Sequence, residues 1–271
     1  MTSIAAAPGR ARADYSELNL AGSFRLSSPG HPTETAIRLP GDVHTALLEA
    51  KAIPDPYVGI NEQAVMWVNE TAWTVERTFA ATPADVDGYL TLTLENVDTI
   101  ATVILNGKVL AKTQNMFIRY DLDVTGKVAV GENTLRIEFD CAREVAWERA
   151  RAHPFPLPFT NNYKSNGLPG VPLNFVRKVA CHAGWDWGIC LMPTGVYGRM
   201  AIRRSRLARQ DGVQVDQKHS RGRVELTITT RITAFADGEV TLSHGLDGQH
   251  IGGAVAVRIG ENVFHHKLTV A

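Results

Sequence analysis

Along much of the chain, apolar and polar residues alternate with a period of two. Five segments show this pattern, are rich in β-branched residues and end at turn residues: Trp73–Phe79, Tyr89–Glu95, Thr102–Leu105, Thr134–Phe139 and Arg223–Thr229. Successive side chains in a strand point to opposite faces of the sheet, so such segments bury one face and expose the other. The pattern predicts an all-β fold of the β-sandwich type.

Local signals refine this picture. Asn106-Gly107 separates two short apolar segments, and both residues tolerate the positive φ angles that a two-residue hairpin turn requires. Helices are expected to be few and short. One is predicted over Asp42–Ala50, where Asp42 is a favourable N-cap, and another over Ala142–Ala152, where alanines alternate with charged residues.

The chain divides into three parts. Residues 1–14 are expected to form a disordered tail, because their small apolar stretch is too short for a signal peptide and the arginines follow it. Residues 15–204 form a first domain, and a basic, polar stretch then leads into new alternating strands over residues 205–271. Residues 153–174, rich in proline, predict a long functional loop within the first domain.

Charge and composition exclude several partners. The chain has 271 residues, with 28 Lys+Arg against 28 Asp+Glu, so it lacks the global field that attracts nucleic acid or anionic membranes. No apolar run approaches the ~20 residues that span a bilayer. The three cysteines cannot form a disulfide framework, which favours a reducing, cytoplasmic setting. With no glycine-rich phosphate loop in the sequence, no cofactor is expected.

The segment Cys181–Cys190 carries the most distinctive chemistry, since Trp185, Asp186 and Trp187 stand between two glycines. A tryptophan ring fits the C–H face of a sugar, and a neighbouring carboxylate can accept hydrogen bonds from two adjacent hydroxyls. These three residues are therefore the candidate binding site for a neutral polyol.

A structural interpretation stands beside this one. Both tryptophans could be core residues, with Asp186 closing a turn. Alternation argues against a fully buried triplet, because in an extended backbone Trp185 and Trp187 share one face and Asp186 points to the other.

Other candidate residues are weaker. Cys181, His182 and Cys190 match no standard zinc spacing, so no metal site is expected and the thiols are interpreted as buried and free. His265 and His266 lie in a predicted strand and face opposite ways, so they cannot chelate one ion together. We interpret His44 as a capping or packing residue.

Many motifs in one order connect residues 18–204 with a known family. The domain resembles the N-terminal domain of β-mannosidases of glycoside hydrolase family 2, and the motifs that carry the resemblance are Pro40–Leu48, Ile53–Tyr57, Trp73–Phe79, Asp98–Ala101, Leu105–Gly107, Asn115–Phe117, Gly131–Asn133, Arg177-Lys178 and Gly184–Gly188. The resemblance implies a galactose-binding-like jelly-roll β-sandwich, followed over residues 205–271 by part of an immunoglobulin-like β-sandwich.

The resemblance also implies a role for the tryptophan–aspartate–tryptophan segment. In such enzymes this loop enters the mouth of the catalytic barrel, so Asp186 would bind the O4/O6 side of a terminal mannose and Trp185 and Trp187 would shape the pocket. The substrate would be a mannoside or manno-oligosaccharide. The catalytic acid/base and nucleophile of the family lie on a (β/α)₈ barrel of about 250 residues. We nominate no catalytic residue in this chain, expect it to be a fragment that is inactive alone, and name the absent barrel as its partner.

Two alternatives remain at this point. One is a free-standing carbohydrate-binding module, which would bind mannosides unaided, whereas a pocket shared with a barrel predicts little binding by the chain alone. The other is a purely structural interaction domain, which predicts that Trp185 is buried and unavailable to any ligand.

Overall fold

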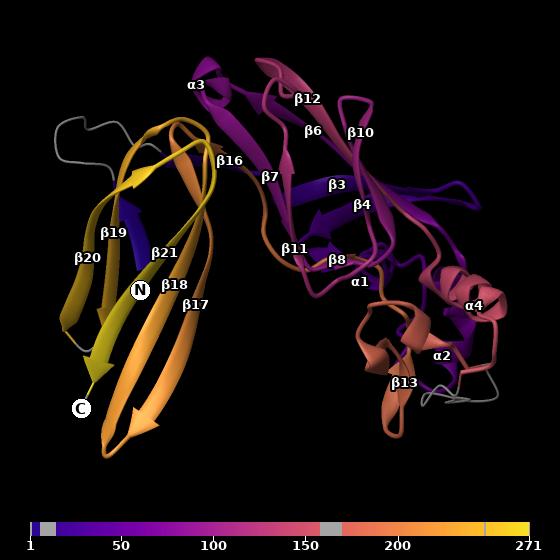
Figure 1. Cartoon of the computed structure of the whole chain (residues 1–271). Helices are drawn as coiled ribbons and strands as arrows, with labels where there is room; N and C mark the ends of the chain where they lie inside the picture. Colours follow the sequence, from indigo (N-terminus) through magenta and orange to yellow (C-terminus); the bar gives the residue numbers. More distant parts are fainter. Residues whose placement is uncertain (1, 6–14, 158–169, 247, 271) are drawn as a thin grey trace. The chain divides into compact units, whose positions relative to one another are not determined.

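The computed structural model describes residues 2–5, 15–157, 170–246 and 248–270 (Figure 1). It divides into two compact units. The larger unit comprises Glu17–Val86 and Leu90–Arg203, and the smaller unit comprises Arg204–Ala271 with Asp87–Tyr89 and the described part of residues 1–16. The predicted domains, in contrast, are continuous segments that meet between residues 204 and 205.

Two antiparallel sheets form the body of the larger unit. The six-stranded sheet has the order β10-β9-β12-β6-β3-β4 and the four-stranded sheet the order β11-β7-β16-β2. Their strands are β2 Tyr15–Asn19, β3 Gly22–Ser28, β4 His31–Leu39, β6 Trp73–Ala81, β7 Tyr89–Glu95, β9 Ala101–Leu105, β10 Lys108–Thr113, β11 Arg119–Asp123, β12 Gly131–Phe139 and β16 Met200–Ser205.

The main core packs side chains from both sheets into one cluster, with Trp73 and Phe139 among its largest fully buried members. Strands β9 and β12 alternate between buried and less buried positions, as the sequence pattern predicts. Strand β7, in contrast, is buried at five consecutive positions, Leu90–Leu94, because it lies inside the four-stranded sheet and is covered on both faces. Each fully buried large apolar side chain stabilises the fold by roughly 1.5–3 kcal/mol.

Short elements connect and cover the sheets of the larger unit. They are β5 Gly41–Asp42, α1 Val43–Glu49, α2 Asn61–Ala64, η1 Met66–Glu70, α3 Pro83–Val86, β8 Val97–Asp98, α4 Ala142–Ala152, η3 Leu173–Phe175, η4 Ala180–His182, β13 Ala183–Trp185, β14 Gly188–Cys190 and β15 Gly195–Val196. Strand β15 pairs with β5 on one side and β8 on the other. None of the helices in the described part of the chain is long and apolar enough to cross a membrane.

The predicted local signals are confirmed. Asn106 and Gly107 have φ angles of 51° and 75° and join β9 to β10 as a hairpin turn. Asp42 is the N-cap of α1, where its carboxylate accepts a hydrogen bond of 3.0 Å from the amide of Thr45. Helix α4 has the bounds that the sequence predicts.

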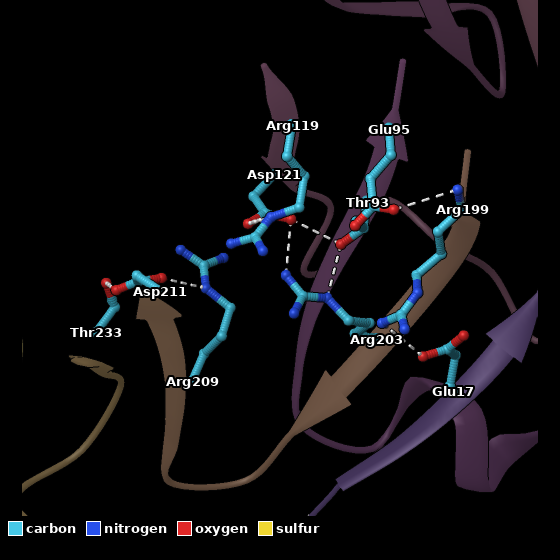
Figure 2. Close-up of polar contacts among 10 residues, drawn as sticks. All are labelled: Glu17, Thr93, Glu95, Arg119, Asp121, Arg199, Arg203, Arg209, Asp211 and Thr233. Carbon is cyan, nitrogen blue, oxygen red and sulfur yellow. Dashed lines mark hydrogen bonds and ion pairs between the residues drawn. The ribbon is translucent and has the colours of Figure 1, made fainter. Parts of the chain in front are cut away.

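A charged network crosses the four-stranded sheet from β16 to β11 (Figure 2). The guanidinium of Arg203 donates to the hydroxyl of Thr93 at 2.6 Å and to Asp121 Oδ1 at 2.7 Å. Thr93 donates to the same carboxylate oxygen at 2.7 Å. The Arg203 and Asp121 side chains are only 10% and 14% exposed, so Arg203 depends on Asp121 to offset its loss of hydration, whereas Asp121 also pairs with Arg119 at 2.8 Å.

The smaller unit contains two three-stranded sheets. Their orders are β1-β19-β20 and β17-β18-β21. The strands are β1 Thr2–Ala5, β17 Ala208–Ser220, β18 Arg223–Ala234, β19 Gly238–Leu246, β20 Gln249–Val257 and β21 Gly260–Val270. Between β17 and β18, Asp211 accepts hydrogen bonds from Arg209 at 2.7 Å and Thr233 at 2.6 Å (Figure 2).

The start of the chain differs from its prediction. Residues 1–14 are predicted to be a disordered tail, but Thr2–Ala5 form β1, which pairs antiparallel with β19 from Thr2↔His244 to Ala5↔Thr241. Strand addition at a sheet edge uses backbone groups, so it leaves little trace in the side-chain pattern. Residues 6–14 lie outside the described residues, as does the central part of the proline-rich loop, residues 158–169.

Replacing Asp121 by asparagine should lower the free energy of unfolding of the larger unit by roughly 3 kcal/mol, because Arg203 then remains buried without a counter-charge. All five tryptophans lie in this unit, so denaturant unfolding followed by tryptophan fluorescence measures it selectively. Glu34→Gln is the control, since the Arg25–Glu34 side chains are 49% and 61% exposed and should contribute less than about 1 kcal/mol. Equal losses in the two variants would contradict this assignment.

Candidate functional site

The three candidate residues lie at the tip of a β-hairpin. Strands β13 and β14 pair with the register Ala183↔Cys190 and Trp185↔Gly188, so Asp186 and Trp187 are the two turn residues. Trp185 is 37% exposed and Trp187 is 85% exposed, and Asp186 is also exposed. The interpretation of both tryptophans as core residues is therefore wrong.

The turn changes the relation between the three side chains. The predicted alternation assumes an extended backbone, but Trp187 lies in the turn rather than in a strand. The rings of Trp185 and Trp187 meet edge to face, with centroids 6.5 Å apart and planes at 71°. The two rings therefore contact each other, and Asp186 is not held between parallel aromatic faces.

The Asp186 carboxylate is available to a ligand. No hydrogen bond or ion pair joins it to another of the residues that the structure describes, although it stands in a turn. A turn-closing aspartate accepts hydrogen bonds from nearby backbone amides. Asp186 therefore stands in the turn, exposed, without accepting a hydrogen bond from any described residue.

A buried ion pair fixes the base of the hairpin. The ammonium of Lys178 lies 2.6 Å from both carboxylate oxygens of Asp98, and both side chains are fully buried. Lys178 precedes the hairpin, and it also donates to the carbonyl of Pro193, which follows the hairpin. One charged group thus connects both ends of the loop to strand β8.

Further hydrogen bonds tie the hairpin to the larger unit. The buried Glu62 of α2 accepts a hydrogen bond of 2.7 Å from the amide of Cys190. The amide of Met192 donates to the carbonyl of His182 at 2.8 Å. His182 Nδ1 lies 3.4 Å from Asp98 Oδ2. The base of the hairpin is therefore well bonded, whereas its tip is exposed.

The electrostatics of the hairpin base follow from this arrangement. Burial opposes ionisation of Asp98, but the close approach of His182 and the charge and hydrogen bonds of Lys178 outweigh it and hold the pKa of Asp98 below its ordinary value. Asp98 therefore stays ionised at neutral pH. Burial lowers the pKa of Lys178, and the charge of Asp98 and its hydrogen bond to Lys178 oppose that effect.

His44 is a second buried titratable group near the hairpin base. It lies on α1 and is buried, which confirms the packing role predicted for it. Burial lowers its pKa to about 4, and the charge of Lys178 also lowers it. His44 is therefore neutral in the folded protein over the physiological range.

The three cysteines are free, but they differ in exposure. Cys190 is buried, which raises the pKa of its thiol to about 11, and Cys141 is partly buried. Cys181 is exposed, so its interpretation as a buried thiol is wrong. It precedes the hairpin in the short 3₁₀ helix η4, in which no residue is buried. Among the described residues, no cluster of three or more His, Cys, Asp or Glu side chains could hold a metal ion.

A groove of about 680 Å³ lies beside the hairpin. Its lining comes from the hairpin, from the segments on either side of it and from one distant residue, and comprises Tyr57, Cys181, His182, Trp185, Trp187, Gly188, Ile189, Leu191 and Pro193. The volume is in the range of small-molecule binding sites. Asp186 does not line it.

Comparison with known proteins assigns this arrangement to a family. Residues 24–198 match the family described as glycosyl hydrolase 2 galactose-binding domain-like. The chain belongs to this family. The resemblance that the sequence motifs indicate is thereby confirmed.

Curated relatives and solved structures agree with the assignment. Beta-mannosidase B of Emericella nidulans is 32% identical over 82% of this chain and 26% of its own length. A probable beta-mannosidase of Caenorhabditis elegans is 30% identical over 68% of this chain and 21% of its own length. The beta-D-mannosidase of Dictyoglomus thermophilum superposes with a TM-score of 0.84 at 26% identity, over 94% of this chain and 31% of that one.

These comparisons confirm the predicted all-β fold class. An exo-chitosanase of Amycolatopsis orientalis shares the fold, with a TM-score of 0.68 at 15% identity. The chain spans about a quarter of the length of the curated family relatives it matches. The family assignment therefore concerns residues 24–198 of this chain.

Replacing Lys178 by methionine should lower the free energy of unfolding by roughly 3–5 kcal/mol, because Asp98 is left buried without a counter-charge. The double variant Asp98→Asn/Lys178→Met should recover part of this loss, since neither buried charge remains. Denaturant unfolding of both variants measures the two values. A double variant no more stable than Lys178→Met would show that the charge on Asp98 is not what destabilises the single variant.

Acidification should destabilise the larger unit through His44. Between pH 6.5, the ordinary pKa, and about pH 4, the unfolded chain binds a proton at His44 that the folded protein does not, so stability present above pH 6.5 is lost as the pH falls. The full loss is roughly 3 kcal/mol. In His44→Leu, unfolding measured across this pH range should show a correspondingly smaller loss. Asp98 contributes at lower pH, below its ordinary value of 3.8. Parallel pH profiles for the two proteins would contradict the assignment to His44.

Proposed function

We propose that this chain is the substrate-recognition portion of a β-mannosidase, a retaining exo-glycosidase that removes terminal β-D-mannose residues. The observation that carries the proposal is the exposed Asp186 carboxylate, which is bonded to none of the described residues and lies at the tip of a firmly anchored hairpin with Trp185 and Trp187 beside it. The names of the relatives support the choice of mannosides as substrate.

Each residue has a separate role in this proposal. Asp186 accepts hydrogen bonds from two hydroxyls at the O4/O6 side of the mannose, because an ionised carboxylate offers acceptor oxygens in the right number. Trp185 and Trp187 offer apolar ring surface to the C–H face of the sugar. The two carboxyl groups that cleave the bond, about 5–5.5 Å apart in a retaining enzyme, belong to a catalytic barrel outside this chain.

The second candidate is a carbohydrate-binding module without catalysis. It is favoured by the exposure of the hairpin tip, since Trp187 is 85% exposed in this chain alone. The two functions differ in a binding experiment. A module binds mannosides as the isolated chain, whereas a recognition hairpin completed by a barrel binds them weakly until the barrel is present.

Two further features belong to the proposal. We infer that the smaller unit is an immunoglobulin-like sandwich, supported by its two three-stranded sheets. We also infer that the protein works in the cytoplasm, supported by three free thiols, which persist in a reducing compartment.

In the complete enzyme, Asp186→Ala should lower kcat/KM on an aryl β-mannoside by about 10²–10⁴-fold and leave the fold intact. A hydrogen bond to a charged group contributes roughly 1.5–3 kcal/mol, so losing two such bonds removes several kcal/mol of transition-state stabilisation. Each loss of about 1.4 kcal/mol lowers kcat/KM tenfold. Steady-state kinetics and the Tm are measured together, with Asp140→Ala, another exposed aspartate of the larger unit, as the control.

If Asp186 only closes the turn, the opposite result is expected. A residue that only closes a turn costs about 1 kcal/mol of stability when it is replaced by alanine, and activity is spared. An Asp186→Ala enzyme that melts early but keeps near-normal kcat/KM would refute the sugar-binding role.

A further inference from the structure

Tyr57 comes from a segment far from the hairpin in sequence, yet it lines the same groove as Trp185 and Trp187. Its side chain is 76% exposed, and Trp187 is 85% exposed. Large exposed aromatic side chains that gather around one concave surface are uncommon without a ligand or partner. Two segments of the larger unit therefore present aromatic rings to a single groove.

The loop that carries Tyr57 is held in a defined conformation. The amide of Tyr57 donates to Asp55 Oδ1 at 2.9 Å, and the side chain of Asn61 donates to the carbonyl of Asp55 at 2.8 Å. These bonds form an Asx-type turn that is tied to helix α2. Tyr57 is thus presented at the surface by a bonded turn, so little conformational entropy is lost when a ligand binds there.

The lining indicates the class of ligand. Among the described residues that line the groove, none carries a carboxylate, ammonium or guanidinium group, so these residues favour neither a cation nor an anion. Aromatic and aliphatic surface alternates with a few polar groups, namely the tyrosine hydroxyl, the imidazole of His182 and the thiol of Cys181. His182 Nδ1 lies 3.4 Å from Asp98 Oδ2. Such a surface suits a neutral ring that has an apolar face and hydroxyls at its edge.

We propose that this groove extends the mannose site into a second sugar subsite, in which Tyr57 holds the sugar ring that adjoins the terminal mannose while Trp185 and Trp187 contact the mannose. The inference rests on the proposed function, in which Asp186 binds the mannose itself. Asp186 lies outside the groove whereas Trp185 and Trp187, which flank it in the chain, line it. The groove has a volume of about 680 Å³ and is lined by Tyr57 as well as by the tryptophans, so it can hold a second ring beside the mannose, as a manno-oligosaccharide requires.

The test compares two substrates that differ only in the leaving group. β-Mannosyl fluoride has no second ring, whereas β-1,4-mannobiose places one in the groove. In the complete polypeptide that carries this chain, Tyr57→Ala should lower kcat/KM for mannobiose about three- to tenfold and leave kcat/KM for the fluoride within about twofold of wild type. Tyr57→Phe, which keeps the ring, should retain most of the activity on mannobiose.

Ile60→Ala is the matched control, because Ile60 is on the same loop, is 73% exposed and does not line the groove. It should leave both substrates unaffected. A matching loss on mannobiose in Ile60→Ala would assign the effect to the loop and overturn the role of Tyr57.

The remaining outcomes distinguish failure of the subsite from failure of the mannosidase function. If the wild-type protein hydrolyses neither substrate, the proposed function fails and the subsite fails with it. If it hydrolyses the fluoride but not mannobiose, or if Tyr57→Ala changes both substrates equally or neither, the subsite is overturned while the mannosidase function stands.

Discussion

The buried ion pair between Lys178 and Asp98 is the interaction on which the candidate site depends. Removing two charges from water costs several kcal/mol per ion, and only close, well-bonded partners offset that cost. Here the ammonium contacts both oxygens of the carboxylate and the carbonyl of Pro193 as well. A hydrophobic contact would tolerate many docking positions for the hairpin. A buried ion pair with this geometry favours a single position of the hairpin, so it determines where the hairpin lies on the sandwich.

The base of the hairpin is bonded to the rest of the larger unit, whereas its tip is exposed. Cys190 is buried at the base, where its amide binds the carboxylate of Glu62, whereas Trp187 at the tip is 85% exposed. The hydrogen bonds at the base are satisfied within the protein, so they position the tip before any ligand arrives. Binding then loses little conformational entropy, which is the physical advantage of a preorganised site. The exposed aromatic surface is the corresponding cost, since it is left in contact with water until the site is filled.

Signals that are local in sequence predict the fold well and the site poorly. Strand alternation, the Asn106-Gly107 turn and the Asp42 cap each follow from residues within one element, and the structure confirms them. Strand β1 was missed because edge pairing uses the backbone. The turn at Trp187 was missed because the register of β13 with β14 depends on pairing across the hairpin. Burial of Lys178 has no local signal either, since only its partner Asp98, distant in sequence, makes a buried lysine tolerable.

The sandwich and the loops therefore carry different information about function. The exo-chitosanase of Amycolatopsis orientalis shares the fold at a TM-score of 0.68 with 15% identity, so the two packed sheets alone cannot decide which sugar is bound. That decision must come from groups placed on the sandwich by contacts between distant segments, such as the bond from Cys190 to Glu62 or the groove shared by Tyr57 and Trp187. Changing the sugar specificity of such a domain then requires changes in its loops, whereas changes in the sheets alter stability before they alter recognition.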